Sequence, residues 1–279
     1  MRGFQGVVPC GSAAIMAFMP LDDQRGRSVF DAAAGEYDAA RPSYPAELYD
    51  RLEAVAGPLA GQTVLDWGAG TGISGRQLAA RGARVTLLDI GEQMLRYART
   101  RDPLARCVLA DGNRMPIRDG CADLTTFAQS WHWFQLPGAQ AEVVRVLRPG
   151  GYWAAWWSRA KAGGQDWFDR YEDVLVRYCP GFTWRHLRDE LLEPDWTADA
   201  IAARGLVEPA SPVVVQWTRT VPVEQWITDE RSKSYFISLA PDVRELALGR
   251  LTEIITAEFP GGLMVVPYIT TLLMARRIS

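Results

Sequence analysis

Short apolar runs alternate with amphipathic stretches along the first half of the chain. The apolar runs are typical of buried strands and lie at 63–65, 84–88, 105–109, 122–127 and 152–157. Stretches with helical periodicity separate them, at 46–55, 73–81, 91–101 and 139–147. Strands that alternate with helices in this way form a parallel sheet covered on both faces. The pattern therefore predicts a doubly wound α/β fold.

The alternation stops after residue 158. Aromatic-rich, mainly helical patterns follow at about 158–205 and 220–260. Two further strands are expected, at 213–217 and 265–275. Because doubly wound folds bind their ligands at the carboxyl edge of the sheet, we expect the two helical stretches to form a lid over that edge.

The first 25 residues show no periodic pattern and carry Pro9, Gly11 and Pro20. We expect them to be a flexible N-terminal extension, which leaves 26–279 as one domain. A chain of 279 residues is long enough for one large α/β domain with a lid.

The run VLDWGAGTG at 64–72 is the most informative segment. A buried strand, a glycine turn and a helix make the first half of a nucleotide-binding α/β unit. Glycines let the backbone approach a ligand closely. The N-terminus of the next helix offers free N–H groups to an anionic group. The ligand is therefore expected to be a dinucleotide or S-adenosylmethionine (SAM).

Both ligands have support in the sequence. The glycine run also matches G-x-G-x-x-G, and Asp89 follows Gly70 by 19 residues, so an NAD-dependent oxidoreductase is one alternative. Three features favour SAM instead. Asp66 precedes the glycines, where a dinucleotide-binding strand is usually apolar; Asp111 ends the third strand; and the turn LRPGG stands at 147–151.

With these features, the chain resembles the class I SAM-dependent methyltransferases, in particular their small-molecule, type 11-like branch of bacterial natural-product enzymes. The resemblance spans about 30–157 and rests on the segments 64–72, 85–89, 110–112, 129–134 and 147–151. It implies a Rossmann-like, seven-stranded, mostly parallel sheet with an inserted helical lid. It also implies methyl transfer from SAM, with S-adenosylhomocysteine (SAH) as the product.

Carried over residue by residue, the resemblance implies a cofactor pocket. Asp66, Gly68, Gly70 and Gly72 would hold the methionine part of SAM. Asp89 would accept hydrogen bonds from both ribose hydroxyls, because a carboxylate is a natural bidentate acceptor for a cis-diol.

The remaining cofactor contacts follow from the later segments. Ile90 and Met94 would flank the adenine. Asp111 would accept from the adenine amino group, with Gly112 beside it, and Gln129 would face the methionine end. From the N-terminal segment, the resemblance places Tyr37 and Arg41 over the cofactor.

Methyl transfer from a sulfonium is an in-line displacement on an activated electrophile. A base is needed only if the acceptor must lose a proton, so we expect no metal ion. His132 is the first candidate base, because its ordinary pKa suits proton abstraction near neutral pH. Tyr37 is a competing polar group. The alternative is that His132 is structural and packs beneath the cofactor.

The acceptor is less defined than the cofactor. Trp131, His132, Trp157 and His186 are candidate substrate contacts. The aromatic lid favours a planar acceptor, methylated at a ring carbon such as that of an indole, or at a phenolic oxygen, in secondary metabolism. A small carboxylic acid is an alternative, as is a protein that binds SAM without catalysis.

Composition narrows the partners. The net charge of −3 and the pI near 5.6 argue against nucleic-acid binding through bulk electrostatics. No apolar run reaches the roughly 20 residues that a membrane helix needs. Four scattered cysteines are typical of a reducing cytosol. We therefore expect a cytoplasmic monomer or homodimer whose partner is a small-molecule acceptor.

Overall fold

The computed structural model describes residues 41–134, 138–179, 207–209, 212–237 and 239–278, together with Gly35 and Asp38. Its strands are β1 (Thr63–Trp67), β2 (Arg84–Asp89), β3 (Arg106–Leu109), β4 (Ala122–Ala128), β5 (Leu147–Ala160), β6 (Val207–Pro209), β7 (Val213–Pro222) and β8 (Leu263–Arg277). Its helices are α3 (Ala46–Ala56), α4 (Ile73–Ala80), α5 (Glu92–Arg101), the 3-10 helix η1 (Trp131–Trp133), α6 (Gly138–Val146), α7 (Asp166–Tyr178), α9 (Val223–Arg231), α10 (Ser234–Ile237) and α11 (Pro241–Glu258).

These strands form one mixed sheet in the order β3-β2-β1-β4-β5-β8-β6, with β7 also paired to β8. β1 to β5 are parallel to one another, and β8 is antiparallel to β5. β6 and β7 pair with successive stretches of β8 and share one position at its side. The sheet therefore has seven positions, which confirms the predicted seven-stranded, mostly parallel arrangement.

Helices cover both faces of the parallel strands. On one face, α3 and α4 bury Leu48 and Leu78 against Trp156 of β5. On the other face, α6 buries Val143 against Phe127 and Trp153. Because apolar side chains of the strands point alternately to the two faces, both faces need this cover. The predicted doubly wound α/β fold is confirmed.

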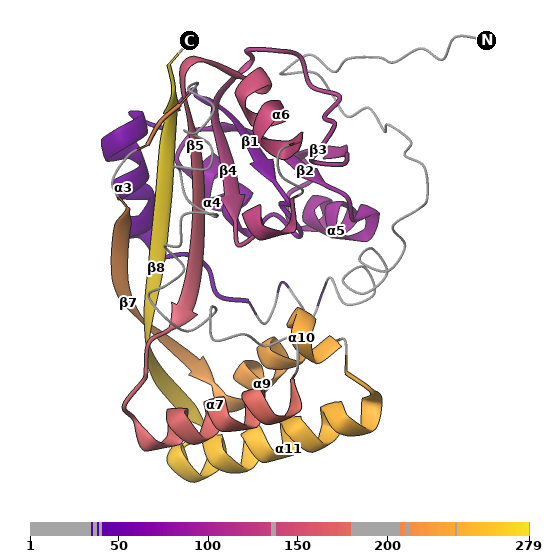
Figure 1. The fold of residues 1–279 in the computed structure, drawn as a ribbon, viewed down its shortest axis with the longest axis vertical. Coiled ribbons are helices and arrows are strands. Elements are labelled where there is room, and N and C mark those ends of the chain that lie inside the picture. The colour runs from indigo at the N-terminus through magenta and orange to yellow at the C-terminus, as the bar shows by residue number, and fades with distance from the viewer. Residues whose placement is uncertain are drawn as a thin grey trace, which may run out of the picture.

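The three longest strands, β5, β7 and β8, continue beyond this sandwich and end against a second group of helices (Figure 1). We call α7, α9, α10 and α11 the helical layer. It has its own apolar core, which includes Trp167, Phe168, Trp226, Leu251 and Met264. The layer lies beyond the carboxyl ends of the parallel strands, at the lower end of Figure 1.

The second half of the chain follows the sequence pattern with longer strands than predicted. The strand expected at 213–217 runs on to Pro222 in β7, and the one expected at 265–275 is Leu263–Arg277 in β8. The predicted extension at 1–25 and much of the first lid insertion lie outside the described residues. No helix in the described ranges is long and apolar enough to cross a membrane.

Candidate functional site

The glycine turn lies between β1 and α4. Gly68, Gly70 and Gly72 have φ of 62°, 55° and 80°, in the left-handed region that favours glycine. A Cβ at Gly68 would lie 2.7 Å from Cβ of Ser130, so the turn packs closely on the loop after β4. At Gly70, by contrast, a Cβ would meet no heavy atom within 4 Å. The turn therefore leaves open space where a ligand can approach the backbone.

Asp89, at the end of β2, lies against this turn. Its Oδ2 accepts a hydrogen bond from the backbone N–H of Gly70 at 2.7 Å, and its Oδ1 accepts one from Gly91 at 2.7 Å. The carboxylate therefore joins the glycine turn to the start of α5. Since an ionised carboxylate has about four lone-pair sites, it can accept further hydrogen bonds from a ligand. The structure thus brings together the two features that the sequence singled out.

Asp66 lies at the same edge but is fully buried. Its Oδ1 accepts a hydrogen bond from Oγ1 of Thr126 on β4 at 2.7 Å. Burial raises the pKa of Asp66 to about 7; the Thr126 hydrogen bond lowers it and the negative charge of Asp89 raises it. Its proton therefore leaves near neutral pH, which the sequence alone did not indicate.

The loop after β3 supplies Asp111 and Gly112. Oδ1 of Asp111 accepts from the backbone N–H of Asn113 at 2.9 Å and from its Nδ2 at 2.8 Å. A Cβ at Gly112 would lie 1.9 Å from the ring of Phe134, so only glycine fits. Phe134 also packs edge-on against Trp67 and Phe127. The sequence did not indicate that Phe134 fixes this loop, although Phe134 is the last residue of the segment 129–134 that supports the resemblance.

The two predicted adenine neighbours differ in exposure. Ile90 is 41% exposed directly after Asp89, whereas Met94 is 5% exposed in α5. An exposed isoleucine at this edge offers an apolar surface to a flat ligand. Met94 belongs to the buried face of α5.

Gln129 directly follows β4 and has a strained backbone conformation. Among the described residues it is the non-glycine residue with positive φ, at 59°. Its backbone N–H donates to the carbonyl of Trp156 at 2.9 Å, and its Nε2 donates to the carbonyl of Ser158 at 2.9 Å. Strain of this kind costs of order 1 kcal/mol and is found at functional sites. Both bonds hold Gln129 at the carboxyl edge, between β4 and β5.

The predicted acceptor contacts are only partly described. The backbone of residues 131–133 forms η1, but the side chain of His132, and all of Tyr37 and His186, lie outside the described residues. Trp131 is 2% exposed and packs against Phe127 and Trp153, so its indole belongs to the core of the sheet. Trp157 is half-buried against the same core.

Arg41 contacts the helical layer. Its Nε lies 3.3 Å from Oδ1 of Asp229 on α9. Oδ2 of Asp229 accepts a hydrogen bond from Nη1 of Arg219 on β7 at 2.7 Å, and Arg219 also donates to the hydroxyl of Tyr268 at 3.2 Å. Sequence reasoning missed Asp229 and Arg219, since no local motif marks them.

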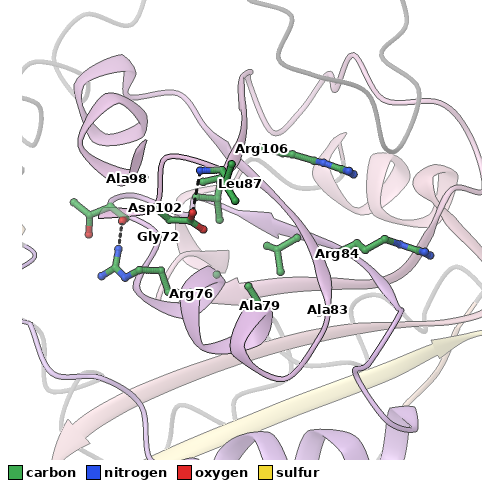
Figure 2. Close-up of a pocket in the computed structure, with 14 residues that line it drawn as sticks. Gly72, Arg76, Ala79, Ala83, Arg84, Leu87, Ala98, Asp102 and Arg106 are labelled. Carbon is green, nitrogen blue, oxygen red and sulfur yellow. Dashed lines mark hydrogen bonds between the residues drawn. The ribbon is translucent and has the colours of Figure 1, made fainter. Parts of the chain in front are cut away.

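A cavity of about 190 Å³ lies between α4 and α5 against β2 (Figure 2). Gly72, Leu87 and Ala98 line it, while Arg84 and Arg106 stand at the amino ends of their strands. None of Asp89, Asp111 and Gln129 lines it. The cavity is therefore a gap between two helices that reaches the glycine turn at Gly72 but not the three polar side chains of the carboxyl edge.

Comparisons with known proteins agree with this geometry. Residues 65–155 match a family model described as a methyltransferase domain. An uncharacterised methyltransferase of Mycobacterium tuberculosis is 30% identical over 252 residues, which cover 88% of this chain and 94% of that protein. A malonyl-[acyl-carrier protein] O-methyltransferase of Serratia marcescens is 37% identical over 132 residues, 47% of this chain and 51% of that protein.

Solved structures show the same fold. A putative type II methyltransferase from Anaeromyxobacter dehalogenans is 23% identical with a TM-score of 0.58, over 85% of this chain and 98% of that one. A Haemonchus contortus phosphoethanolamine N-methyltransferase, in complex with SAM, is 15% identical with a TM-score of 0.51, over 89% of this chain and 57% of that one. With the full-length relative and the glycine turn at the carboxyl edge, these findings show that the chain belongs to the class I SAM-dependent methyltransferases.

Proposed function

We propose that the chain transfers a methyl group from SAM to a small-molecule acceptor at the carboxyl edge of its sheet. The observation that carries the proposal is the contact between Asp89 and the glycine turn. The carboxylate is held by the N–H groups of Gly70 and Gly91, beside the open space in front of Gly70. A nucleoside with a cis-diol fits such a fixed acceptor.

The other cofactor contacts follow from the same edge. Asp89 binds the ribose hydroxyls, Asp111 and Gly112 lie beside the adenine, and Ile90 covers its face. For the methionine end, the residues are Asp66, Gly68, Gly70, Gly72 and Gln129. The N-terminus of α4 lies directly after the turn and favours the methionine carboxylate. Tyr37, Arg41 and Met94 complete the proposed set.

SAM supplies a methyl group that is already activated by its sulfonium. The chain must therefore place the acceptor in line with the methyl–sulfur bond and exclude water. We propose that the helical layer, with the segment before β6, is the lid that does this. Where the acceptor atom carries a proton, His132 or Tyr37 removes it as a general base. With an acceptor that carries no such proton, His132 has a structural role.

The acceptor is proposed to be a small aromatic molecule of secondary metabolism, methylated at a ring carbon or a phenolic oxygen. The aromatic-rich sequence at about 158–205 and 220–260 supports a planar acceptor. A small carboxylic acid is the alternative, supported by the O-methyltransferase relative. We further propose a cytoplasmic monomer or homodimer that acts without a nucleic-acid or membrane partner.

Calorimetry with SAH tests this function. The chain should bind SAH, and Asp89→Ala should weaken binding by about 1–3 kcal/mol, or roughly 10- to 100-fold, because buried hydroxyl partners are lost. Asp166→Ala is the control, because that carboxylate lies on α7 with a side chain 89% exposed. Unchanged affinity in Asp89→Ala would remove Asp89 from the site. A chain that binds SAH is then assayed with labelled SAM against indoles, phenols and small acids; turnover of none would indicate SAM binding without catalysis.

A further inference from the structure

Residues 41–45, which we call the strap, are attached to the helix that follows the glycine turn. The backbone N–H of Tyr44 donates to Oε1 of Gln77 on α4 at 3.1 Å, and its carbonyl accepts from Nε2 of the same side chain at 2.8 Å. The Tyr44 ring meets Trp156 of β5 edge-on, with centroids 5.8 Å apart. The strap is therefore fixed to the α/β half of the molecule at α4 and β5.

The other end of the strap is bound to the helical layer through Asp229. Arg41 pairs with Oδ1 of Asp229 at 3.3 Å, while Arg219 of β7 pairs with Oδ2 at 2.7 Å. The side chain of Asp229 is 4% exposed, and that of Arg41 is 21% exposed. In Figure 1 the strap, in indigo, runs from α3 to the region between the α/β half and the helical layer. One buried carboxylate therefore joins the strap, β7 and α9.

This carboxylate is charged in the fold. Burial raises the pKa of Asp229, but the positive charges of Arg41, Lys233 and Arg219 outweigh burial, and the pKa lies below its ordinary value. The ion pair with Arg41 therefore persists at neutral pH. Loss of one partner from such a buried pair leaves the other charge uncompensated. A substitution that removes the charge and keeps the shape of the side chain is therefore enough to disrupt the contact.

We propose that Asp229 is a positioning residue for methyl transfer, which acts through Arg41 to fix the strap between the glycine turn and the helical layer. The proposal rests on the proposed function. The carboxylate of Asp229 pairs with Arg41 of the strap and with Arg219 of β7. Its effect on a ligand at that turn therefore passes through the strap and α4. The intact pair slows the departure of SAH.

A double-mutant cycle tests this route. The dissociation rate of SAH is measured on the full chain by stopped-flow tryptophan fluorescence for the wild type, Asp229→Asn, Arg41→Met and the double variant. Each single substitution should raise the rate by about tenfold, within the usual range of coupling between sites. The double variant should be no faster than either single one. If Asp229→Asn raises the rate by the same factor in both backgrounds, it acts through folding or Arg219, and the proposal is wrong.

Two further variants separate positioning from general loss of packing. Arg41→Lys keeps a cation and should restore much of the slow dissociation seen in the wild type. Arg244→Met removes hydrogen bonds from α11 to the carbonyls of Ile237 and Leu239, which do not involve the strap. It should lower stability and leave the SAH rate unchanged. An equal rise in the rate in Arg244→Met would contradict a route through the strap.

Hydrogen exchange without any ligand keeps the test independent of the proposed function. The Tyr44 N–H is protected by Gln77, so it reports on the strap. Asp229→Asn should make this N–H exchange faster, whereas Arg244→Met should not. A chain that binds no SAH would overturn the proposed function, and the exchange rate of Tyr44 would still decide the role of Asp229. Unchanged exchange in Asp229→Asn would overturn that role.

Discussion

Replacement of Asp66 by asparagine measures how much the buried, ionised carboxylate lowers the free energy of unfolding. Asp66 has no solvent exposure, and its Oδ1 accepts a hydrogen bond from Thr126 at 2.7 Å. Burial raises its pKa from 3.8 to about 7. Asparagine has nearly the same shape, and its amide oxygen can accept the same hydrogen bond. The substitution therefore removes the charge and keeps the packing.

The sign and size of the effect follow from proton binding. The folded chain binds a proton on Asp66 more tightly than the unfolded chain does, so ionisation of Asp66 opposes folding. The stability from the protonated carboxyl is fully present below about pH 4 and is lost as the pH rises through about 7. Each tenfold change in proton affinity corresponds to about 1.4 kcal/mol, which makes the full loss about 4 kcal/mol. As the pH rises from 5 to 8, the free energy of unfolding of Asp66→Asn should therefore increase by about 3 kcal/mol relative to that of the wild type.

Urea unfolding at several pH values measures this difference directly. The free energy of unfolding is compared between Asp66→Asn and the wild type from pH 5 to pH 8, without ligand. Asp166→Asn serves as the control, because its side chain is 89% exposed and the substitution leaves the buried carboxylate of Asp66 in place. A constant difference between Asp66→Asn and the wild type over this range would refute the reasoning.

Three other substitutions probe the site. Gly112→Ala should lower the free energy of unfolding by about 1–3 kcal/mol or more, since its Cβ would lie 1.9 Å from the Phe134 ring; Phe134→Leu in the same chain should recover part of the loss in thermal unfolding. Gly70→Ala should cost only about 1–2 kcal/mol of stability, because φ is 55° and the space is open. It should nevertheless weaken SAH binding by calorimetry, and equal affinity would place the ligand elsewhere. His132→Ala should lower turnover about 10²-fold if His132 is the base, whereas full-rate turnover would assign it a structural role.

The parts of the site that the sequence predicted are those in which one short segment determines the geometry. The glycine turn needs positive φ at residues that are close together in the chain, and closely spaced glycines in the sequence indicate such a turn. Asp89 and Asp111 follow apolar strands, and parallel strands bring their carboxyl ends to one edge. The prediction that these features lie together depends only on local pattern and the topology of a parallel sheet.

Strand ends were less predictable. The sequence LRPGG predicted a turn at 147–151 and a strand from 152, but β5 begins at Leu147, so this boundary is wrong. Leu147 pairs with Ala122 and Tyr152 pairs with Leu124. The predicted turn therefore lies inside β5 as an irregularity in its pairing with β4. Pairing with β4 overrides the local preference of proline and glycine, and no pattern within the segment itself reveals a partner strand.

Contacts between segments that are distant in the chain could not be predicted from the sequence. Arg41 and Asp229 lie 188 positions apart in the chain, and although the resemblance singled out Arg41, nothing near either residue indicates that the two pair. The burial of Trp131 was equally unpredictable. The sequence made it a candidate substrate contact, and the structure places its indole in the core between Phe127 and Trp153. Burial depends on what the fold packs against a residue, which the sequence near that residue does not record.

The two halves of the molecule differ in what fixes their geometry. At the carboxyl edge, backbone N–H groups hold the carboxylate of Asp89 beside the glycine turn. Beyond that edge, the buried side chain of Arg219 on β7 contacts Asp229 and Trp226 of α9. The strap joins the two halves, because Arg41 pairs with Asp229 and Tyr44 is bound to Gln77 of α4.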